Sequence, residues 1–185
     1  MTIDLFIDIP EINEIIVALP LDSMNQINNT NNKIRYTIGG CTRQDSVYKC
    51  LQLCNKDNKY VMIHDGVRPF FKKEDLYEMM NLVAIHNAVV PGSKVTNTLK
   101  QINENKIEKT IPRDNMVEVY TPQIFSLSMI QDFHNKAHEI RLDFTDDSSI
   151  LEYFGETVHF YELSYKNIKI TTFTDIKFME ALCTE

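Results

Sequence analysis

Short apolar runs alternate with longer helical patterns along most of this chain. Each run is rich in β-branched or aromatic residues and ends at a proline, a glycine or a polar cluster, as buried strands do. The predicted strands are residues 12–20, 36–38, 60–63, 88–90, 158–163 and 167–171. The predicted helices are residues 45–53, 73–86, 128–140, 148–154 and 175–182. The alternation predicts an α/β fold, in which a mostly parallel sheet is covered by helices on both faces.

A second pattern interrupts this alternation between residues 95 and 120. Polar and apolar residues alternate at positions 98–102, a polar turn follows at 103–105, and the alternation then resumes. Alternation on both sides of a polar turn is typical of a β-hairpin. We therefore expect one domain over residues 1–185, with an inserted hairpin arm at about residues 95–121.

The composition argues against several classes of protein. The chain has 26 acidic and 19 basic residues, a net charge of −7, which disfavours non-specific binding to nucleic acid or anionic membranes. Its four cysteines include no C-x-x-C pair and have no accompanying histidine cluster, so a zinc site is not expected. The sequence shows neither a cationic signal-peptide start nor an apolar run long enough to span a bilayer. We expect a soluble protein with reduced thiols, located in the cytoplasm or in an organelle stroma.

The strongest local signal for chemistry is the stretch HDGVRP at residues 64–69, directly after a predicted strand. Ligands of open α/β sheets bind beyond the carboxyl ends of the strands, where Asp65 would lie. A carboxylate at this place suits Mg²⁺, which needs few protein ligands and takes the others from water and phosphate. The alternative is that Asp65 caps the next turn and pairs with Arg68 for structural reasons. The spacing alone favours neither interpretation.

Two weaker signals accompany this stretch. Residues 39–47 (GGCTRQDSV) place a glycine pair and a helix N-terminus after a strand, an arrangement that lets backbone N–H groups approach a ligand. A plain strand-to-helix turn capped by Asp45 or Ser46 explains the same pattern, and spacing alone favours it. The second signal is cationic and consists of Lys100, Arg113 and Lys169. Lys169 interrupts an apolar run, so it either meets an anion such as phosphate or extends to solvent from the sheet edge.

Five stretches, taken in order, resemble the 2-C-methyl-D-erythritol 4-phosphate cytidylyltransferases and, less closely, the ribitol-5-phosphate cytidylyltransferases. They are GGCTRQDSV at 39–47, IHDGVRPF at 63–70, TPQIF at 121–125, TDDSS at 145–149 and NIKITT at 167–172. The resemblance covers essentially the whole chain, and the second and fifth stretches are specific. It implies a Rossmann-like nucleotidyltransferase fold with three α/β/α layers. It also implies a homodimer, because the hairpin arm of that family embraces a second subunit.

The resemblance assigns roles to individual residues as well. Asp65 matches the metal-coordinating aspartate, so Mg²⁺ or another divalent cation is the implied cofactor. The implied CTP-binding residues are Gly39, Gly40, Ser46, Asp65 and Gly66. The implied residues for the sugar-alcohol phosphate are Asn97, Thr98, Arg113, Thr121, Thr145 and Lys169. Of these, Arg113 and Lys169 are the implied catalytic residues, and Arg113 and Thr121 would serve the neighbouring subunit's site.

The implied reaction is transfer of a cytidylyl group from CTP. An oxygen of the acceptor's phosphate attacks the α-phosphorus of CTP and pyrophosphate leaves, so positioning and charge neutralisation carry the catalysis. Lys169 and Arg113 would reduce the repulsion between the two phosphate anions. Residues 46–47 and 95–100 favour methylerythritol phosphate as the acceptor. Residues 111–113 together with Met116 favour ribitol phosphate, which stays open as the alternative.

The sequence departs from the family's pattern in two ways. The family begins with a central strand and a glycine-rich loop that holds the triphosphate, but no glycine precedes Gly39 here. We therefore expect an N-terminally truncated form that leaves apolar surface uncovered. It would be a fragment of a working enzyme, a shortened homologue that binds without catalysis, or an enzyme completed by another chain. In addition, Asn97 stands where the family usually has aspartate, so it supplies a hydrogen bond without a charge.

Overall fold

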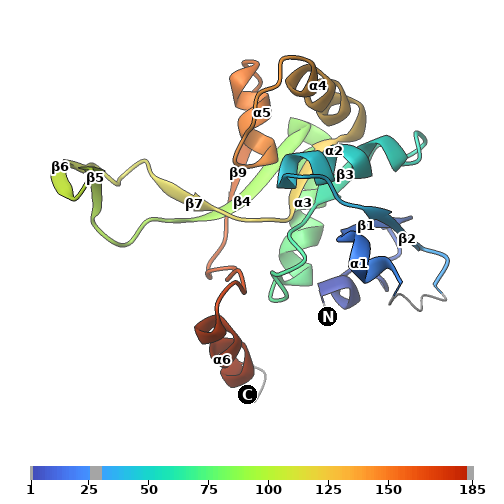
Figure 1. Cartoon of the computed structure of the whole chain (residues 1–185), viewed down its shortest axis with the longest axis horizontal. Helices are drawn as coiled ribbons and strands as arrows, with labels where there is room; N and C mark the ends of the chain where they lie inside the picture. The colour runs from blue at the N-terminus through green and yellow to red at the C-terminus, as the bar shows by residue number, and fades with distance from the viewer. Residues whose placement is uncertain (1, 26–30, 183–185) are drawn as a thin grey trace.

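Strands and helices alternate along the chain in the computed structural model, which describes residues 2–25 and 31–182 (Figure 1). The strands are β1 (Ile15–Leu19), β2 (Ile34–Ile38), β3 (Tyr60–Ile63), β4 (Ala88–Lys94), β5 (Leu99–Asn103), β6 (Lys106–Ile111), β7 (Val117–Val119), β8 (Gln123–Ser126) and β9 (His159–Glu162). The helices are α1 (Leu21–Met24), α2 (Arg43–Leu53), α3 (Lys73–His86), α4 (Leu127–Glu139), α5 (Asp147–Tyr153) and α6 (Phe173–Leu182), after a 3₁₀ turn at Thr2–Leu5. Among these described helices, none has the length and apolar character needed to cross a membrane.

The central sheet is mixed. β3 and the start of β4 both pair antiparallel with β8, which therefore lies between them. The end of β4 pairs antiparallel with β7, and β9 pairs parallel with β4 along its other edge. A separate two-stranded ladder joins β1 and β2 in parallel, from Ile15 opposite Ile34 to Leu19 opposite Ile38. β3, β4 and β9 consequently run in one direction.

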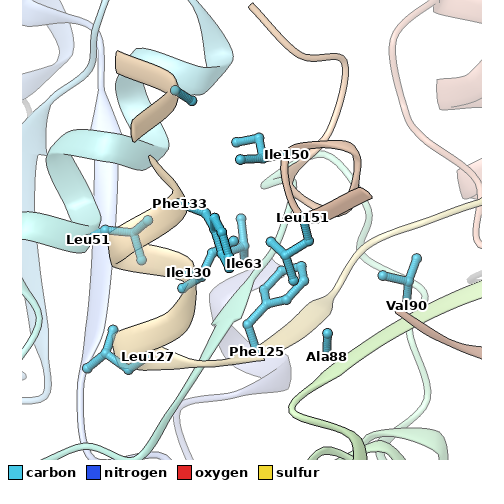
Figure 2. Packing of buried hydrophobic residues seen from close by; sticks show 11 residues of the cluster. Leu51, Ile63, Ala88, Val90, Phe125, Leu127, Ile130, Phe133, Ile150 and Leu151 are labelled. Atoms are coloured by element: carbon cyan, nitrogen blue, oxygen red, sulfur yellow. The ribbon is translucent and has the colours of Figure 1, made fainter. Parts of the chain in front are cut away.

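Two apolar clusters cover the two faces of the central sheet. One cluster packs α2, α4 and α5 against the sheet through residues such as Leu51, Ile130 and Leu151 (Figure 2). The other packs α3 and the N-terminal turn against the opposite face. Neighbouring residues of β8 divide between them, because Phe125 belongs to the first cluster and Ile124 to the second. This alternation is the period of two expected for a strand buried on both faces.

The helices begin and end where local chemistry allows. A capping box starts α2, since the Thr42 hydroxyl accepts from the Asp45 backbone N–H and the Asp45 carboxylate accepts from that of Thr42. Asp146 caps α5 by accepting from the backbone N–H of Ser149. After α5 the chain turns at Gly155, whose φ of +84° is unfavourable for residues with a side chain.

The predicted arm is a long extension that leaves the body of the molecule (Figure 1). β5 and β6 form the expected antiparallel hairpin at its tip, and β7 brings the chain back to the sheet. Most arm side chains are exposed, including Ile102 and Ile107, which face each other across the ladder. The arm therefore presents apolar side chains to its surroundings.

One predicted strand is absent from the structure, and one strand of the structure was not predicted. Residues 167–171 are extended but join no ladder, and Lys169 lies beside the loop after β3 rather than in a strand. The Asn167 amide donates to the Thr121 carbonyl and the Ile170 N–H donates to the Val67 carbonyl, so this segment is held by the loop. β8 was not predicted, because its sequence QIFS has only two apolar residues, too few to show a strand pattern.

A large cavity lies between β1 and β3. Its volume is about 1280 Å³, and apolar side chains of β1, β3 and α2 line it, including Ile15, Val17, Val61 and Leu51. Glu14 lies just before β1 and accepts hydrogen bonds from the Asn55 backbone N–H and the Asn58 side-chain amide, which precede β3. These bonds hold the starts of β1 and β3 together. At its polar end the cavity reaches Asp65.

Candidate functional site

Asp65 follows β3 directly and meets three cations. Its Oδ1 accepts from Arg43 Nε at 3.1 Å, and its Oδ2 lies 3.2 Å from both Arg68 Nε and Lys169 Nζ. Only 12% of the Asp65 side chain is exposed. Burial raises the pKa of this carboxyl, but the charges of Arg43 and Lys169 outweigh burial and hold the pKa at about 2. Asp65 is therefore a permanent anion at neutral pH.

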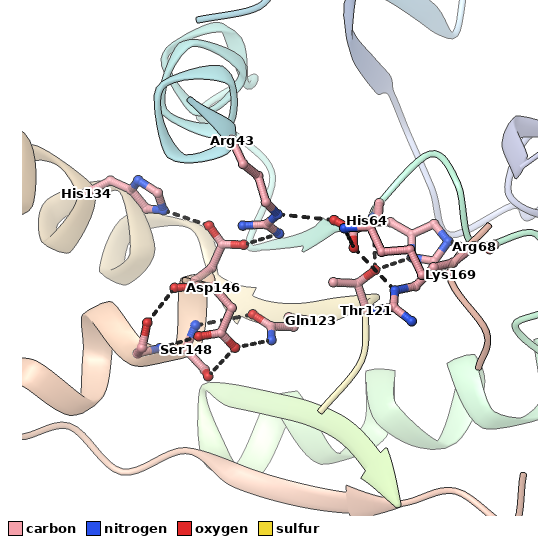
Figure 3. Close-up of polar contacts among 12 residues, drawn as sticks. Arg43, His64, Arg68, Thr121, Gln123, His134, Asp146, Ser148 and Lys169 are labelled. Carbon is pink, nitrogen blue, oxygen red and sulfur yellow. Dashed lines mark hydrogen bonds and ion pairs between the residues drawn. The ribbon is translucent and has the colours of Figure 1, made fainter. Parts of the chain in front are cut away.

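A neutral hydrogen-bond network fixes the backbone around Asp65 (Figure 3). The Asp65 N–H donates to Thr121 Oγ1 at 2.9 Å, and that hydroxyl lies 3.0 Å from His64 Nδ1. His64 Nε2 lies 3.0 Å from the Arg68 carbonyl, which can only accept. Nε2 must then carry the proton, so the Thr121 hydroxyl donates to Nδ1. Burial lowers the pKa of His64 to about 4, consistent with a neutral ring.

The end of β2 supplies a tight backbone turn near this loop. Ser46 Oγ accepts from the Gly40 N–H at 2.9 Å and donates to the Thr42 carbonyl at 2.9 Å. A Cβ on Gly40 would lie 2.1 Å from the Cβ of Asp45, so only glycine fits here. A small cavity of about 310 Å³ lies beside the turn, lined by Gly39, Gly40, Ser46 and residues at the end of β1.

Arg43 connects the turn after β2 with Asp65 at the end of β3. It stands at the first position of α2, and its Nε and Nη2 bind two different carboxylates, those of Asp65 and Asp147, at 3.1 and 2.8 Å (Figure 3). Asp147 belongs to the first turn of α5 and is 1% exposed, as is its second partner, His134 of α4. The polar site thus continues from the sheet edge into the layer formed by α4 and α5.

The comparisons with known proteins decide the family. The family model described as 2-C-methyl-D-erythritol 4-phosphate cytidylyltransferase matches residues 1–185. The chain belongs to this family. A cytidylyltransferase of that name from Geobacillus kaustophilus is 40% identical over 146 residues, 79% of this chain and 64% of the relative. The chloroplastic enzyme of that name from Oryza sativa subsp. japonica is 34% identical over 97% of this chain and 62% of the relative.

Solved structures agree with this assignment. The structure of 4-diphosphocytidyl-2C-methyl-D-erythritol synthase from Anaerococcus prevotii superposes with a TM-score of 0.90 at 32% identity, covering all of this chain and 84% of that one. The Francisella tularensis 2-C-methyl-D-erythritol 4-phosphate cytidylyltransferase gives a TM-score of 0.88 at 30% identity. The nucleotidyltransferase fold predicted from the sequence is therefore confirmed. The chain spans less than two thirds of the length of the first curated relatives it matches.

The structure brings most of the predicted cytidylyltransferase site residues to the ends of β2 and β3, which Arg43 connects. Asp65, Gly66 and Lys169 lie together at the end of β3, and Gly39, Gly40 and Ser46 lie at the end of β2. Thr121 was expected to serve the neighbouring subunit. In the structure the residue is 5% exposed, and its hydroxyl accepts a hydrogen bond from the backbone N–H of Asp65 in the same chain.

The remaining predicted residues lie apart from Asp65. Thr145 is exposed, one residue before the cap of α5. Asn97, Thr98 and Arg113 lie exposed on the arm, where the Arg113 guanidinium donates to the Thr96 carbonyl. Among the described residues, no hydrogen bond or ion pair links these three to Asp65. Within a single chain, the arm residues and the Asp65 loop therefore form two separate groups.

Sequence reasoning missed four residues that support the site. Arg43 and Asp147 lie inside motifs of this cytidylyltransferase family, but the sequence analysis predicted no binding or catalytic role for either residue. His64 precedes Asp65, and its position next to a predicted ligand was the available signal. His134 could not be predicted, because a histidine on the apolar side of a predicted helix is interpreted as an ordinary core residue.

One residue of the site fits a divalent cation. The described part of the chain has no group of three or more His, Cys, Asp or Glu side chains that could hold a metal ion alone. Asp65, however, is a permanently charged oxygen donor at the edge of the sheet, which suits Mg²⁺ carried on phosphate oxygens. Its Oδ2 is shared by two cations, Arg68 and Lys169, whereas its Oδ1 is held by Arg43 alone.

Proposed function

We propose that this chain transfers a cytidylyl group from CTP to 2-C-methyl-D-erythritol 4-phosphate, giving CDP-methylerythritol and pyrophosphate. Family membership supports the reaction class, and the names of the relatives support the acceptor. The observation that carries the proposal is the placement of Asp65 and Lys169 after β3 and of the Gly40 turn after β2, two groups that Arg43 connects. The relatives include bacterial and chloroplastic enzymes, which favours action in a cytoplasm or a plastid stroma.

The residues divide the work of binding two anions. The Gly39-Gly40 turn and Ser46 offer a compact backbone surface for the cytosine and ribose of CTP. The side chain of Lys169 is 42% exposed, so its ammonium, which is paired with Asp65, is also accessible to the acceptor's phosphate. A phosphate oxygen of the acceptor attacks the α-phosphorus, and the bond to the β-phosphate oxygen breaks as pyrophosphate takes the electron pair. Mg²⁺ held by Asp65 would neutralise charge on the triphosphate.

Lys169 and Arg43 set the electrostatics of this step within the chain. Both carry positive charge next to Asp65, so two phosphate groups can approach each other with less repulsion. Thr121 and His64 contribute rigidity, because their hydrogen bonds fix the backbone on which Asp65 stands. Positioning and charge neutralisation, rather than covalent chemistry, are the contributions expected of the protein.

The proposed assembly is a homodimer formed through the arm. The arm exposes apolar side chains, including Ile102 and Ile107, which are 64% and 65% exposed. Exposed apolar residues gathered on one projecting element are typical of a protein interface. Arg113 lies on the same arm, away from its own Asp65, so we propose that it serves the acceptor's phosphate in the neighbouring subunit.

Pyrophosphate release tests the proposed reaction. The purified chain is incubated with CTP and Mg²⁺, with methylerythritol 4-phosphate or ribitol 5-phosphate as the acceptor. We expect release with methylerythritol 4-phosphate, lowered about 100-fold or more by Asp65→Asn, the scale expected when one preorganised charge is removed. Asp132→Asn, an exposed carboxylate on α4, is the matched control and should keep the activity. Turnover with ribitol 5-phosphate alone would reassign the substrate, and silence with both would refute catalysis by this chain.

A further inference from the structure

A buried polar pair lies beneath the site and is not used by the proposed reaction. His134 of α4 and Asp147 of α5 have side chains 0% and 1% exposed, and His134 Nε2 lies 3.1 Å from Asp147 Oδ1. A buried carboxylate is costly unless charged or hydrogen-bonding partners surround it. Asp147 has two such partners, because Arg43 Nη2 lies 2.8 Å from its other oxygen.

Packing of the apolar core does not require a histidine at position 134. The other ring nitrogen of His134, Nδ1, has no hydrogen-bond partner among the described residues. A leucine at this position would fill similar space next to Ile130 and Phe133 without leaving a ring nitrogen unpaired. What His134 provides that a leucine would not is therefore its hydrogen bond to Asp147. Asp147 in turn forms an ion pair with Arg43.

Arg43 transmits the position of Asp147 to Asp65. Its guanidinium is planar and rigid, so the direction of one N–H fixes the direction of the others. With Nη2 held by Asp147, Nε points at Asp65 Oδ1 at 3.1 Å (Figure 3). A rotation of the Asp147 carboxylate would turn the guanidinium and break the bond that anchors Oδ1.

We propose that His134 is a positioning residue for the reaction, acting through Asp147 and Arg43 on the carboxylate of Asp65. This inference rests on the proposed function, because it is that function that needs Asp65 in one orientation. Asp65 Oδ1 stays anchored to Arg43, whereas Oδ2 is shared by Arg68 and Lys169. When Lys169 engages the acceptor's phosphate, the anchored carboxylate keeps Oδ2 directed at the nucleotide.

Two substitutions at one position test the proposal. His134→Leu removes the donor to Asp147, and His134→Gln keeps an N–H at similar reach. Ile130→Ala is the matched control, since Ile130 is equally buried on the same helix and its side chain takes part in none of these hydrogen bonds or ion pairs. Thermal melting confirms that each variant is folded at the temperature of the assay.

The first readout does not depend on catalysis. An arginine Nε–H held by a carboxylate exchanges slowly with water, so Arg43 should give a resolved Nε–H signal in a ¹⁵N–¹H NMR spectrum. We expect this signal to be lost or broadened in His134→Leu, retained in His134→Gln and unchanged in Ile130→Ala. An unchanged Arg43 signal in His134→Leu would overturn the proposal, whether or not the chain turns over CTP.

The second readout separates positioning from binding. Residues that orient a ligand-bearing group typically change activity by about 10- to 100-fold when removed. We expect His134→Leu to lower kcat on this scale, with the KM for methylerythritol 4-phosphate within about twofold of the original, and His134→Gln to restore most of the rate. Equal losses in His134→Leu and Ile130→Ala would overturn the proposal. Failure of the unmodified chain to release pyrophosphate would refute the proposed function and leave the NMR result to decide the role of His134.

Discussion

The histidine next to Asp65 should make the fold sensitive to acid. His64 has an ordinary pKa of 6.5, and burial lowers it to about 4 in the folded chain. Between these values the unfolded chain binds a proton that the folded chain does not, so stability is lost as the pH falls. We expect the free energy of unfolding to decrease by about 3 kcal/mol as the pH falls through this window, the order of magnitude given by the pKa difference.

Urea denaturation of the unmodified chain and of His64→Gln measures this effect. Glutamine keeps a donor for the Arg68 carbonyl but binds no proton, so the variant should lose most of the pH dependence in this window. The charge of Asp65 does not interfere, because its pKa falls from 3.8 to about 2 on folding, and its stabilisation is lost only as the pH drops below 3.8. An equally steep decline in the variant would contradict a neutral, buried His64.

At the residue scale, the sequence predicts the positions of site residues that directly follow a strand better than those of site residues that other elements contribute. Asp65 and Gly40 follow apolar runs, so the strand pattern alone locates them at the sheet edge. Thr121 was found only through a family motif, whereas Lys169 was indicated both by the apolar run that it interrupts and by a family motif. Arg43 and Asp147 meet across 104 positions of the chain, a separation that no local pattern spans.

At the element scale, α5 depends on its capping residue more than an ordinary helix does. Asp146 accepts from the Ser149 N–H, from the Ser148 hydroxyl and from the Gln123 amide at 2.7 Å. Asp146→Ala removes the cap and leaves the buried Gln123 amide without its acceptor. We expect a loss of about 2–4 kcal/mol in the free energy of unfolding, combining a cap with one buried unpaired group.

Chemical denaturation compares this variant with Thr42→Ala, which removes the cap of α2. The Thr42 hydroxyl accepts one backbone bond, from Asp45, and lies exposed, so its loss should cost about 1 kcal/mol. Equal losses in the two variants would show that the bond between Asp146 and Gln123 adds nothing to the helix cap. That result would also weaken the view of α5 as a fixed platform for Asp147.

The arm should control assembly without controlling the fold. Ile102 and Ile107 lie opposite each other in the β5–β6 ladder and are mostly exposed. Replacing both with lysine places charge in the proposed interface, so we expect sedimentation to change from dimer to monomer while the melting of the body stays similar. Ile85→Lys, on the exposed side of α3, is the matched control. A monomeric unmodified chain, or a dimer that survives both lysines, would contradict assembly through the arm tip.

Elements with a clear period were predictable, and those held by tertiary contacts were not. α3 and β3 match their predicted bounds because their apolar patterns begin and end at polar residues or turns. β8 has only two apolar residues, and its strand state comes from pairing with β3 and β4. Residues 167–171 have the apolar alternation of a strand, but bonds to the β3 loop hold them away from the sheet.

At the scale of the whole molecule, the α/β class follows from the sequence but the division of the sheet does not. The alternation of strands and helices implies parallel crossovers with covered faces. It does not show that β1 and β2 form a ladder of their own, separated from β3 by a cavity of about 1280 Å³. That separation depends on packing between residues far apart in the chain, for which the sequence carries no local signal.

A crystal structure of the chain with CTP and Mg²⁺ tests the nucleotide site most directly. We predict the cytosine and ribose against Gly39, Gly40 and Ser46, the triphosphate towards Lys169, and a metal ion bound to Asp65 Oδ2 with Arg43 still on Oδ1. The Asp65→Asn variant under the same conditions should show no metal ion. CTP bound elsewhere on the chain, or a metal ion bound without Asp65, would contradict a nucleotide site at these strand ends.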